Sequence, residues 1–344
     1  MLFALYITIF FLCLWKIRLP HESGDGYEFL SKPRTESIKG IFILLIVISH
    51  ANGYIKDAGY DYVQLGDQWF LLIIEKLKQL VVVMFLFYSG YGVGLSIHNK
   101  GKSYIKSIPR RRILTTILNM DVAVLVFIAL NLVLGIDMTF SQCGWSLIGW
   151  DSVGNSNWYI FCIVLCYAFS YIAAFFTSKK SLQCAILFIM TAVVIVMLYR
   201  VKEHWWYDTL MAYPLGYAFS CYRDSAIKWI RQNYCTSLLT AVIAFTCLSM
   251  WHHEYLGFRF NAISMAFAMI VLLLTMKVQV HNPVLEWCGK HLFPIYMYMR
   301  LPMIVIENTW HNSMLNAPAL FIGISLMVTL VIAYFYRYWQ IRLT

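Results

Sequence analysis

Long runs of residues without a charged side chain constrain this chain more than any other feature of its sequence. Aspartate, glutamate, lysine and arginine are absent from residues 152–178, 182–199, 232–251 and 308–336. Each run is long enough for a helix to cross the hydrocarbon core of a bilayer, which takes roughly 18 to 20 residues. Only helices and closed barrels satisfy their backbone hydrogen bonds in lipid, and these runs are continuously apolar rather than alternating. The sequence therefore predicts an all-α membrane protein, a polytopic bundle of transmembrane helices.

Further apolar segments bring the expected number of transmembrane helices to about eleven. The chain is 60% hydrophobic and 13% charged, whereas soluble domains carry about 25% charged residues. Residues 1–20 lack a basic leader and a small-residue cleavage site, so we expect a retained helix rather than a signal peptide. Residues 69–80 mix charges with leucine and isoleucine, which predicts an amphipathic helix in the interface. The predicted spans are residues 1–19, 38–55, 81–98, 113–134, 158–177, 182–199, 206–222, 235–251, 260–276, 291–306 and 317–336.

The distribution of positive charge predicts an orientation. Of the 27 lysines and arginines, 20 lie in alternate loops. All of these loops are cytoplasmic if the N-terminus is outside and the C-terminus is cytoplasmic, as the positive-inside rule requires. The loops are residues 16–39, 100–112, 179–180, 223–231, 277–290 and 337–342. This distribution explains the formal net charge of +10 without a nucleic-acid partner.

The stretch KGIFILLIVISH places an ionisable group at each end of an apolar segment. Lys39 opens it, His50 closes it, and the ten residues between them carry no ionisable side chain. In a helix the two groups lie about 16 Å apart along the axis. With Lys39 at the cytoplasmic face, His50 would lie near the middle of a hydrocarbon core about 30 Å thick. An ionisable side chain at that depth indicates a functional site, and the alternative is a histidine at a helix end that water reaches from the far side.

The loop at residues 100–112 carries more positive charge than topology alone requires. It contains six cations and ends in Arg110, Arg111 and Arg112. Arginine forks suit phosphate groups, so the loop is a candidate site for a phosphate-rich donor such as an acyl-CoA. An anionic lipid headgroup is the alternative ligand. If the donor reaches from this loop toward His50, and a hydroxyl acceptor approaches from outside, His50 is suited to take the hydroxyl proton in an acyl transfer.

The order of these motifs resembles that of the integral membrane acyltransferase 3 family, which includes polysaccharide and lipopolysaccharide O-acetyltransferases. Lys39 and His50 have the spacing of the family's Arg-x10-His motif, with lysine in place of arginine. The segment MFLFYSGYGVGLS at 84–96 resembles the family's FFFLSGF helix. The segment PRRRILTT at 109–116 resembles its Arg-x-x-Arg motif, with Thr115 where the second arginine is expected.

Two later segments extend the resemblance. Residues 207–222 resemble the family's helix with the pattern lPlG. Residues 287–302 resemble a segment that ends in a histidine motif, and Met299 stands about where that histidine is expected. The resemblance covers about residues 34–338, so the domain boundaries are placed at 34–338 for a membrane acyltransferase domain and at 1–20 for one helix added to a core of ten.

The resemblance implies a membrane O-acyltransferase of the bacterial plasma (inner) membrane. It would move an acetyl or other short acyl group from acetyl-CoA to a sugar hydroxyl of a surface polysaccharide or its lipid-linked precursor. His50 would be the catalytic base, and the donor would be bound by four cations, namely Lys39, Arg110, Arg111 and Arg112. Trp158 and Arg300 are candidates for acceptor binding, with an aromatic belt and a snorkelling arginine as the alternatives. The nine cysteines contain no CxxC pair, so no metal is expected.

A transporter or flippase for a small solute or glycolipid is the alternative from a different class. It would use the same intramembrane His50 and the same basic mouth without any chemistry. Transporters often contain paired broken helices in two halves of the chain. The sequence shows no such pairing, which favours the enzyme.

Overall fold

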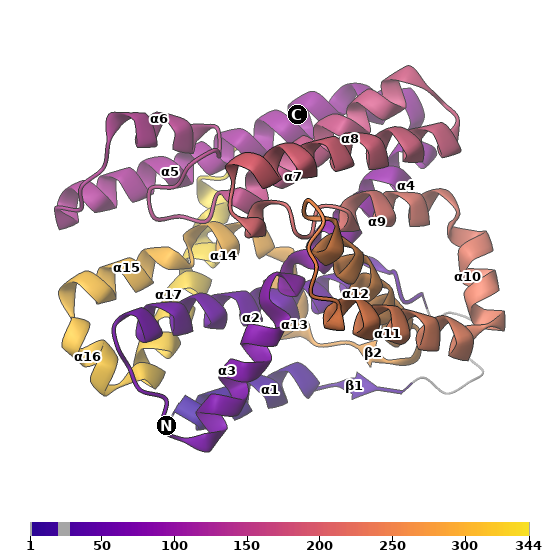
Figure 1. The fold of residues 1–344 in the computed structure, drawn as a ribbon. Coiled ribbons are helices and arrows are strands. Elements are labelled where there is room, and N and C mark those ends of the chain that lie inside the picture. Colours follow the sequence, from indigo (N-terminus) through magenta and orange to yellow (C-terminus); the bar gives the residue numbers. More distant parts are fainter. Residues whose placement is uncertain (1, 20–27, 344) are drawn as a thin grey trace. The chain divides into compact units, whose positions relative to one another are not determined.

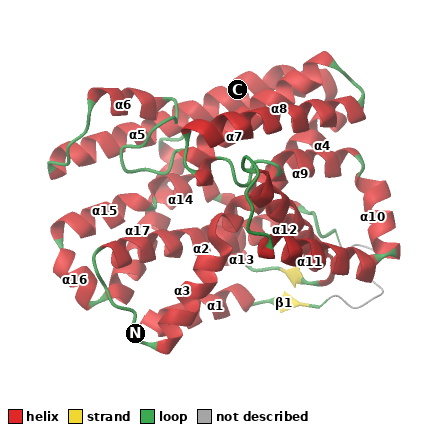
Figure 2. Cartoon of the chain, viewed as in Figure 1, coloured by secondary structure: helices red, strands yellow, loops and turns green. Residues whose placement is uncertain are grey.

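The computed structural model describes residues 2–19 and 28–343, which fold almost entirely into helices (Figure 1, Figure 2). The sheet found in this described part pairs two short antiparallel strands, β1 (Ile17–Arg18) and β2 (Gln279–Val280). The predicted all-α class is therefore confirmed. The chain divides into two compact units, each assembled from separate stretches of sequence.

The first unit contains Met1–Val81, Leu118–Asn157 and Gln279–Ile341. Its helices are α1 (Leu2–Leu14), α2 (Lys32–Asp57), α3 (Leu65–Leu77), most of α5 (Thr115–Leu134), α6 (Phe140–Leu147), α13 (Pro283–Lys290), α14 (Leu292–Tyr298), α15 (Arg300–Thr309), α16 (His311–Asn316) and α17 (Pro318–Phe335), with the 3-10 turns η1 (Lys78–Val82) and η4 (Tyr336–Tyr338). Helix α2 packs against α13, α14, α15 and α17, so it is the central helix of this unit.

Helices α2 and α13 cross at close range because both carry glycine where they meet. A β-carbon on Gly40 would overlap the backbone carbonyl of Leu285, and one on Gly289 would overlap the carbonyl of Glu36. Small residues let helix backbones approach in lipid, where van der Waals contact drives helix association. This packing holds the N-terminal half of α2, which carries Lys39.

The second unit contains residues 82–117 and 158–278 with the last residues of the chain. Its helices are α4 (Val83–Ile108), the π-helical turn η2 (Pro109–Leu114), α7 (Trp158–Phe176), α8 (Lys180–Val201), the 3-10 turn η3 (His204–Trp206), α9 (Ala212–Cys221), α10 (Arg223–Gln232), α11 (Tyr234–Met250) and α12 (Phe258–Lys277). Glycine again permits a close crossing, here between α4 and α9. A β-carbon on Gly90 would overlap the carbonyl of Tyr213, and one on Gly216 would overlap the carbonyl of Phe87.

Six helical stretches of the described chain are long and apolar enough to cross a membrane, and the bent pair α10–α11 is a seventh candidate. The six are Lys32–Asp57, Gln79–Leu134, Trp158–Phe176, Lys180–Val201, Phe258–Lys277 and Pro318–Tyr338. The longest of them is interrupted at Gly101, where φ is 58° and ψ is −142°. Helices α10 and α11 meet at an angle of 98°. The protein is therefore an integral membrane protein, as predicted.

Other predicted spans are shorter or broken. In place of one helix at 291–306, the chain forms α14 and α15, which separate at Met299. Pro294 and Pro302 lie in the first turns of these two helices, where a missing amide hydrogen is tolerated. Pro302 lacks the amide hydrogen that would bond to the carbonyl of Tyr298, so the helix is divided next to Tyr298, although Met299 itself keeps helical φ and ψ of −57° and −32°. Fewer than eleven helices of the described chain are long and apolar enough to cross a membrane. The number of eleven transmembrane helices therefore stays a prediction.

The first helix is also shorter than predicted. Helix α1 ends at Leu14, and Lys16 has a φ of 61°, a left-handed conformation that no α-helix continues. The predicted segment 1–20 extends into residues outside the described ranges. Within the described part, the Tyr6 hydroxyl donates a hydrogen bond of 2.6 Å to Asn52 Oδ1, and the Tyr6 ring stacks on Phe70 at 3.7 Å between centroids. Helix α1 is therefore packed on α2 and α3.

Candidate active site

His50 lies in the C-terminal half of α2 and is half-buried. It interacts electrostatically with Arg300, the first residue of α15. Lys39 and His50 are eleven positions apart, which is three helical turns with only about 20° of rotation between the two side chains. The two residues therefore lie on the same face of α2, about 16 Å apart along its axis.

Arg300 is held against α2 by a tyrosine. Its Nε donates a hydrogen bond of 3.1 Å to the hydroxyl oxygen of Tyr54, and its guanidinium carbon lies 5.5 Å from the centre of the Tyr54 ring. Tyr54 follows His50 by one helical turn, so both side chains share a face. The structure thus brings together the predicted base His50 and the predicted acceptor residue Arg300. Tyr54 was missed in the sequence, and its position four residues after His50 is the signal that could have found it.

A second polar contact anchors α2 near His50. Asn52 accepts hydrogen bonds at Oδ1 from the hydroxyls of Tyr6 (2.6 Å) and Tyr62 (3.0 Å). Its Nδ2 donates to the carbonyl oxygen of Ile48 at 2.9 Å. A buried side-chain amide is destabilising if its donors and acceptors lack hydrogen-bond partners. Asn52 is only 3% exposed, so these bonds are needed. This network fixes the backbone of α2 on both sides of His50.

Lys39 forms an ion pair that the sequence analysis did not include. Its Nζ lies 2.8 Å from Oε2 of Glu36, one turn earlier on α2. Both side chains are largely shielded, with 21% of the lysine and 11% of the glutamate exposed. A ligand phosphate would therefore meet a lysine whose charge is already partly balanced. The spacing of three residues between Glu36 and Lys39 is a helix pairing that the sequence alone could have indicated.

The three arginines of the basic loop lie on η2, in the second unit. Arg110, Arg111 and Arg112 are all exposed. Arg112 keeps accessible surface although tyrosines surround it: its guanidinium carbon lies 6.0 Å from the centre of the Tyr167 ring, and it interacts electrostatically with Tyr104 and Tyr213. Arg112 is therefore an exposed arginine whose guanidinium lies beside tyrosine rings.

The turn that carries these arginines is π-helical, a conformation frequently found at functional sites. Thr115, which stands where the family's second arginine is expected, donates from Oγ1 to the carbonyl oxygen of Arg110 at 2.9 Å. The Thr115 amide also donates to this carbonyl. The threonine thus closes the π-turn. Thr115 supplies no positive charge. Arg112 is therefore the one arginine of the Arg-x-x-Arg motif that this chain retains.

The two residues predicted to bind the acceptor belong to different units. Trp158 is the first residue of α7 in the second unit, is half-buried, and makes an edge contact with the neighbouring Tyr159 ring at 6.1 Å. Arg300 belongs to the first unit. A joint role of Trp158 and Arg300 in acceptor binding stays a prediction.

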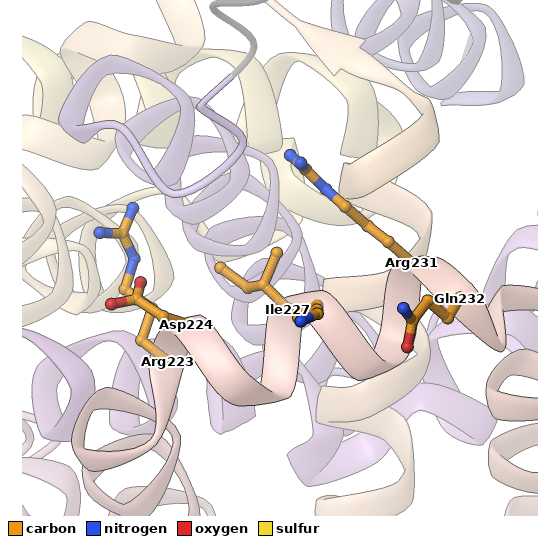
Figure 3. A pocket seen from close by; sticks show the side chains of 6 residues that line it. Arg223, Asp224, Ile227, Arg231 and Gln232 are labelled. Carbon is orange, nitrogen blue, oxygen red and sulfur yellow. The ribbon is translucent and has the colours of Figure 1, made fainter.

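Helix α10 presents a further group of cations, to which the sequence analysis gave only a role in topology. A cavity of about 360 Å³ is lined by Arg223, Asp224, Ile227, Lys228, Arg231 and Gln232. Figure 3 shows Arg223 and Arg231 extending from the two ends of α10, with Ile227 between them. Positive side chains around an open cavity are suited to anionic groups.

Nothing in the described part of the chain resembles a metal centre, because no group of three or more histidine, cysteine, aspartate or glutamate side chains there could hold a metal ion. The groups available for chemistry are the imidazole of His50 with its neighbours Arg300 and Tyr54, and the arginines of η2.

A family model described as an acyltransferase domain, that of acyltransferase 3, matches residues 35–338. Comparison with curated proteins gives no match, and comparison with solved structures gives none.

Proposed function

Because the chain belongs to the acyltransferase 3 family and is a membrane acyltransferase, we propose that it transfers an acetyl or other short acyl group from acyl-CoA to a sugar hydroxyl. The acceptor is a surface polysaccharide or its lipid-linked precursor. This choice of donor and acceptor follows the resemblance of the motifs, and the geometry of His50 supports it.

The observation that carries the proposal is the arrangement of His50, Arg300 and Tyr54. A general base must accept a proton within a site that also stabilises negative charge. His50 provides the imidazole, and Arg300 provides a permanent positive charge that interacts with it electrostatically. The Tyr54 hydroxyl orients the guanidinium. A base beside an oriented cation is the combination that acyl transfer requires.

The reaction proceeds in two steps at this site. Neutral His50 takes the proton of the acceptor hydroxyl while the hydroxyl oxygen attacks the thioester carbonyl carbon, so a C–O bond forms and the carbonyl oxygen becomes negative. Arg300 stabilises that negative oxygen. The intermediate then collapses, the C–S bond breaks, and the leaving thiolate of CoA receives the proton from His50.

The donor is bound from the cytoplasmic side in this proposal. The phosphates of CoA carry several negative charges, and Arg110, Arg111 and Arg112 offer guanidinium groups suited to them. Arg112 is pre-oriented by the surrounding tyrosines, which lowers the entropy lost when a phosphate binds. Lys39, paired with Glu36, is the fourth cation proposed for the donor.

The acceptor approaches from outside. Trp158 offers an aromatic ring for a sugar face, and Arg300 offers hydrogen-bond donors for its hydroxyls. The protein resides in the bacterial plasma membrane, with membrane lipids around it, the N-terminus outside and the C-terminus cytoplasmic. Helix α1 is an addition to the acyltransferase domain.

The proposal is tested by acetyl transfer in purified protein reconstituted in nanodiscs. Acetyl-CoA is supplied with a lipid-linked glycan, and the products are followed as free CoA thiol and as O-acetylated glycan by mass spectrometry. The wild type should release CoA only when the acceptor is present. The His50→Gln variant should release no CoA even with the acceptor. The matched control is His253→Gln, since His253 is an exposed histidine in the loop between α11 and α12.

The outcomes separate the enzyme from the transporter. Acceptor-dependent release of CoA in the wild type and the control supports acyl transfer. Glycan movement across a vesicle membrane with no acetyl incorporation would contradict it.

A further inference from the structure

Two cysteines and a histidine meet inside the second unit, outside the site described above. The Sγ atoms of Cys184 and Cys221 lie 3.6 Å apart. His98 Nε2 lies 3.1 Å from Cys221 Sγ. The three residues come from α8, α9 and α4, so distant parts of the sequence converge on one sulfur atom.

The surroundings hold these sulfurs in place. Lys180 Nζ donates a hydrogen bond of 3.1 Å to the backbone carbonyl of Cys221, and the Tyr217 hydroxyl donates to Gln183 Oε1 at 2.8 Å. Both bonds join α8 to α9 next to the cysteines. Cys184 is 8% exposed and Cys221 is 5% exposed. The packing of α8 against α9 therefore keeps the two sulfur atoms in contact.

The cluster is suited to thiolate chemistry. The Cys221 sulfur faces the S–H group of Cys184 and a ring nitrogen of His98, so His98 is placed to accept the thiol proton of Cys221. The thiolate is the form of cysteine that reacts with oxidants, and a neighbouring imidazole can take the proton that must leave. A thiolate in contact with a second thiol is the arrangement of redox-active cysteine pairs.

Another cysteine pair of the same unit offers a comparison. Cys162 and Cys166 lie one turn apart on α7 and are both buried. The thiol of Cys162 donates to the backbone carbonyl of Trp206 at 3.1 Å. Its hydrogen bond is thus made to the backbone, whereas Cys221 faces a histidine and a second sulfur. Among the described residues, no group of three or more histidine, cysteine, aspartate or glutamate side chains is placed to hold a metal ion.

We propose that Cys184 and Cys221 form a site of reversible covalent modification, in which a peroxide oxidises the two thiols to a disulfide. The Cys221 sulfur attacks one peroxide oxygen, an S–O bond forms, the O–O bond breaks, and the leaving hydroxide takes the thiol proton through His98 to become water. The Cys184 sulfur then attacks Cys221, the S–S bond forms, the S–O bond breaks, and a second water leaves. The two sulfurs together lose the two electrons that reduce one peroxide.

Little movement is required for this step. A disulfide needs about 2.0 Å between the sulfurs, so they must approach from the observed 3.6 Å. The bond would join the second turn of α8 to the last turn of α9. Helix α9 also carries Tyr213, one of the tyrosines around Arg112. The modification therefore acts on a helix that contributes to the arginine cluster.

The test uses the full-length protein in nanodiscs. Hydrogen peroxide is titrated, remaining thiols are blocked with N-ethylmaleimide, and the digest is searched by mass spectrometry for a linked peptide pair containing Cys184 and Cys221. We expect this link to form at lower peroxide than any change at Cys162 or Cys166, and dithiothreitol to reverse it. In Cys184→Ser the oxidation should stop at a sulfenic acid on Cys221, which dimedone traps. His98→Gln should slow the reaction several-fold.

Three results would overturn the proposal. The first is full maleimide labelling of Cys184 and Cys221 at peroxide concentrations that oxidise the other cysteines. The second is linkage of Cys221 to a cysteine of another molecule instead of Cys184. The third is stoichiometric zinc or copper in the purified protein that protects both thiols, because the pair would then be metal ligands. Maleimide labelling of the wild type tests whether Cys184 and Cys221 form a disulfide, even if a variant fails to fold.

Discussion

Arg300 donates a hydrogen bond of 3.1 Å from Nε to the hydroxyl oxygen of Tyr54, and this bond joins α15 to α2 one turn beyond His50. The same guanidinium interacts electrostatically with His50. In the proposed reaction Arg300 faces the oxygen that becomes negative, and Tyr54 determines where the guanidinium is placed.

The first prediction concerns this hydrogen bond. Tyr54→Phe removes the acceptor of Arg300 and keeps the ring. Hydrogen bonds to charged groups contribute about 1.5–3 kcal/mol, which corresponds to roughly 10- to 100-fold in rate. We expect turnover to fall by that factor with little change in the donor Michaelis constant. Tyr60→Phe is a matched control, since Tyr60 lies beyond the end of α2. Normal turnover in Tyr54→Phe would mean that the orientation of Arg300 does not matter for the chemistry.

The second prediction distinguishes the arginines of the basic loop. Both Arg111 and Arg112 are exposed, and the guanidinium carbon of Arg112 lies 6.0 Å from the centre of the Tyr167 ring. Lysine keeps the charge but loses the planar fork and its stacking. Arg112→Lys should therefore raise the donor Michaelis constant markedly, and Arg111→Lys should leave it nearly unchanged. Binding of acyl-CoA measured by calorimetry checks both. Equal effects of the two substitutions would show that only the charge of the loop matters.

The third prediction concerns the ion pair of Glu36 and Lys39. Lys39→Met leaves a largely shielded carboxylate without its partner, which is costly. We expect a lower melting temperature and lost activity in this variant, and much of the activity retained in Lys39→Arg. Adding Glu36→Gln to Lys39→Met should restore the melting temperature without restoring activity. Recovery of both in the double variant would reduce Lys39 to a structural partner of Glu36.

The fourth prediction concerns pH. Burial raises the pKa of Glu307 above its ordinary value of 4.5, Asp57 adds to this effect, and His311 and Arg300 oppose it. The folded protein therefore holds this proton more tightly than the unfolded chain does, so the contribution of Glu307 to stability falls as pH rises from about 4.5 through the raised pKa. Glu307→Gln should remove this part of the pH dependence. Melting temperatures of both proteins between acid and neutral pH check it, and parallel curves would contradict it.

The sequence was sufficient for the features that depend on local patterns. Uncharged runs predicted membrane helices, and the spacing of Lys39 and His50 predicted their common helix. The break of the helix at 291–306 was also within reach, because Pro294 and Pro302 are visible in the sequence. It was missed because apolar length was given more weight than the prolines.

Other features depend on contacts between distant residues. The bond between Tyr54 and Arg300 joins residues 246 positions apart, and no periodicity indicates it. The contact of Arg112 with Tyr167 joins residues 55 positions apart, and the three arginines lie on a π-helical turn. Local composition does not distinguish this turn from an ordinary helix. The contact of Cys184 with Cys221 likewise requires the packing of α8 on α9.

The central claim is that His50 takes a proton from the acceptor. The most direct measurement compares single-turnover acetyl transfer by the wild type, His50→Ala and His50→Gln in nanodiscs, with acyl-CoA binding measured separately. General-base catalysis contributes roughly 10²- to 10⁴-fold, and an amide cannot accept the proton. We predict that both variants bind the donor normally and lose turnover by about that factor. Turnover at the wild-type level in His50→Gln would contradict proton abstraction by His50.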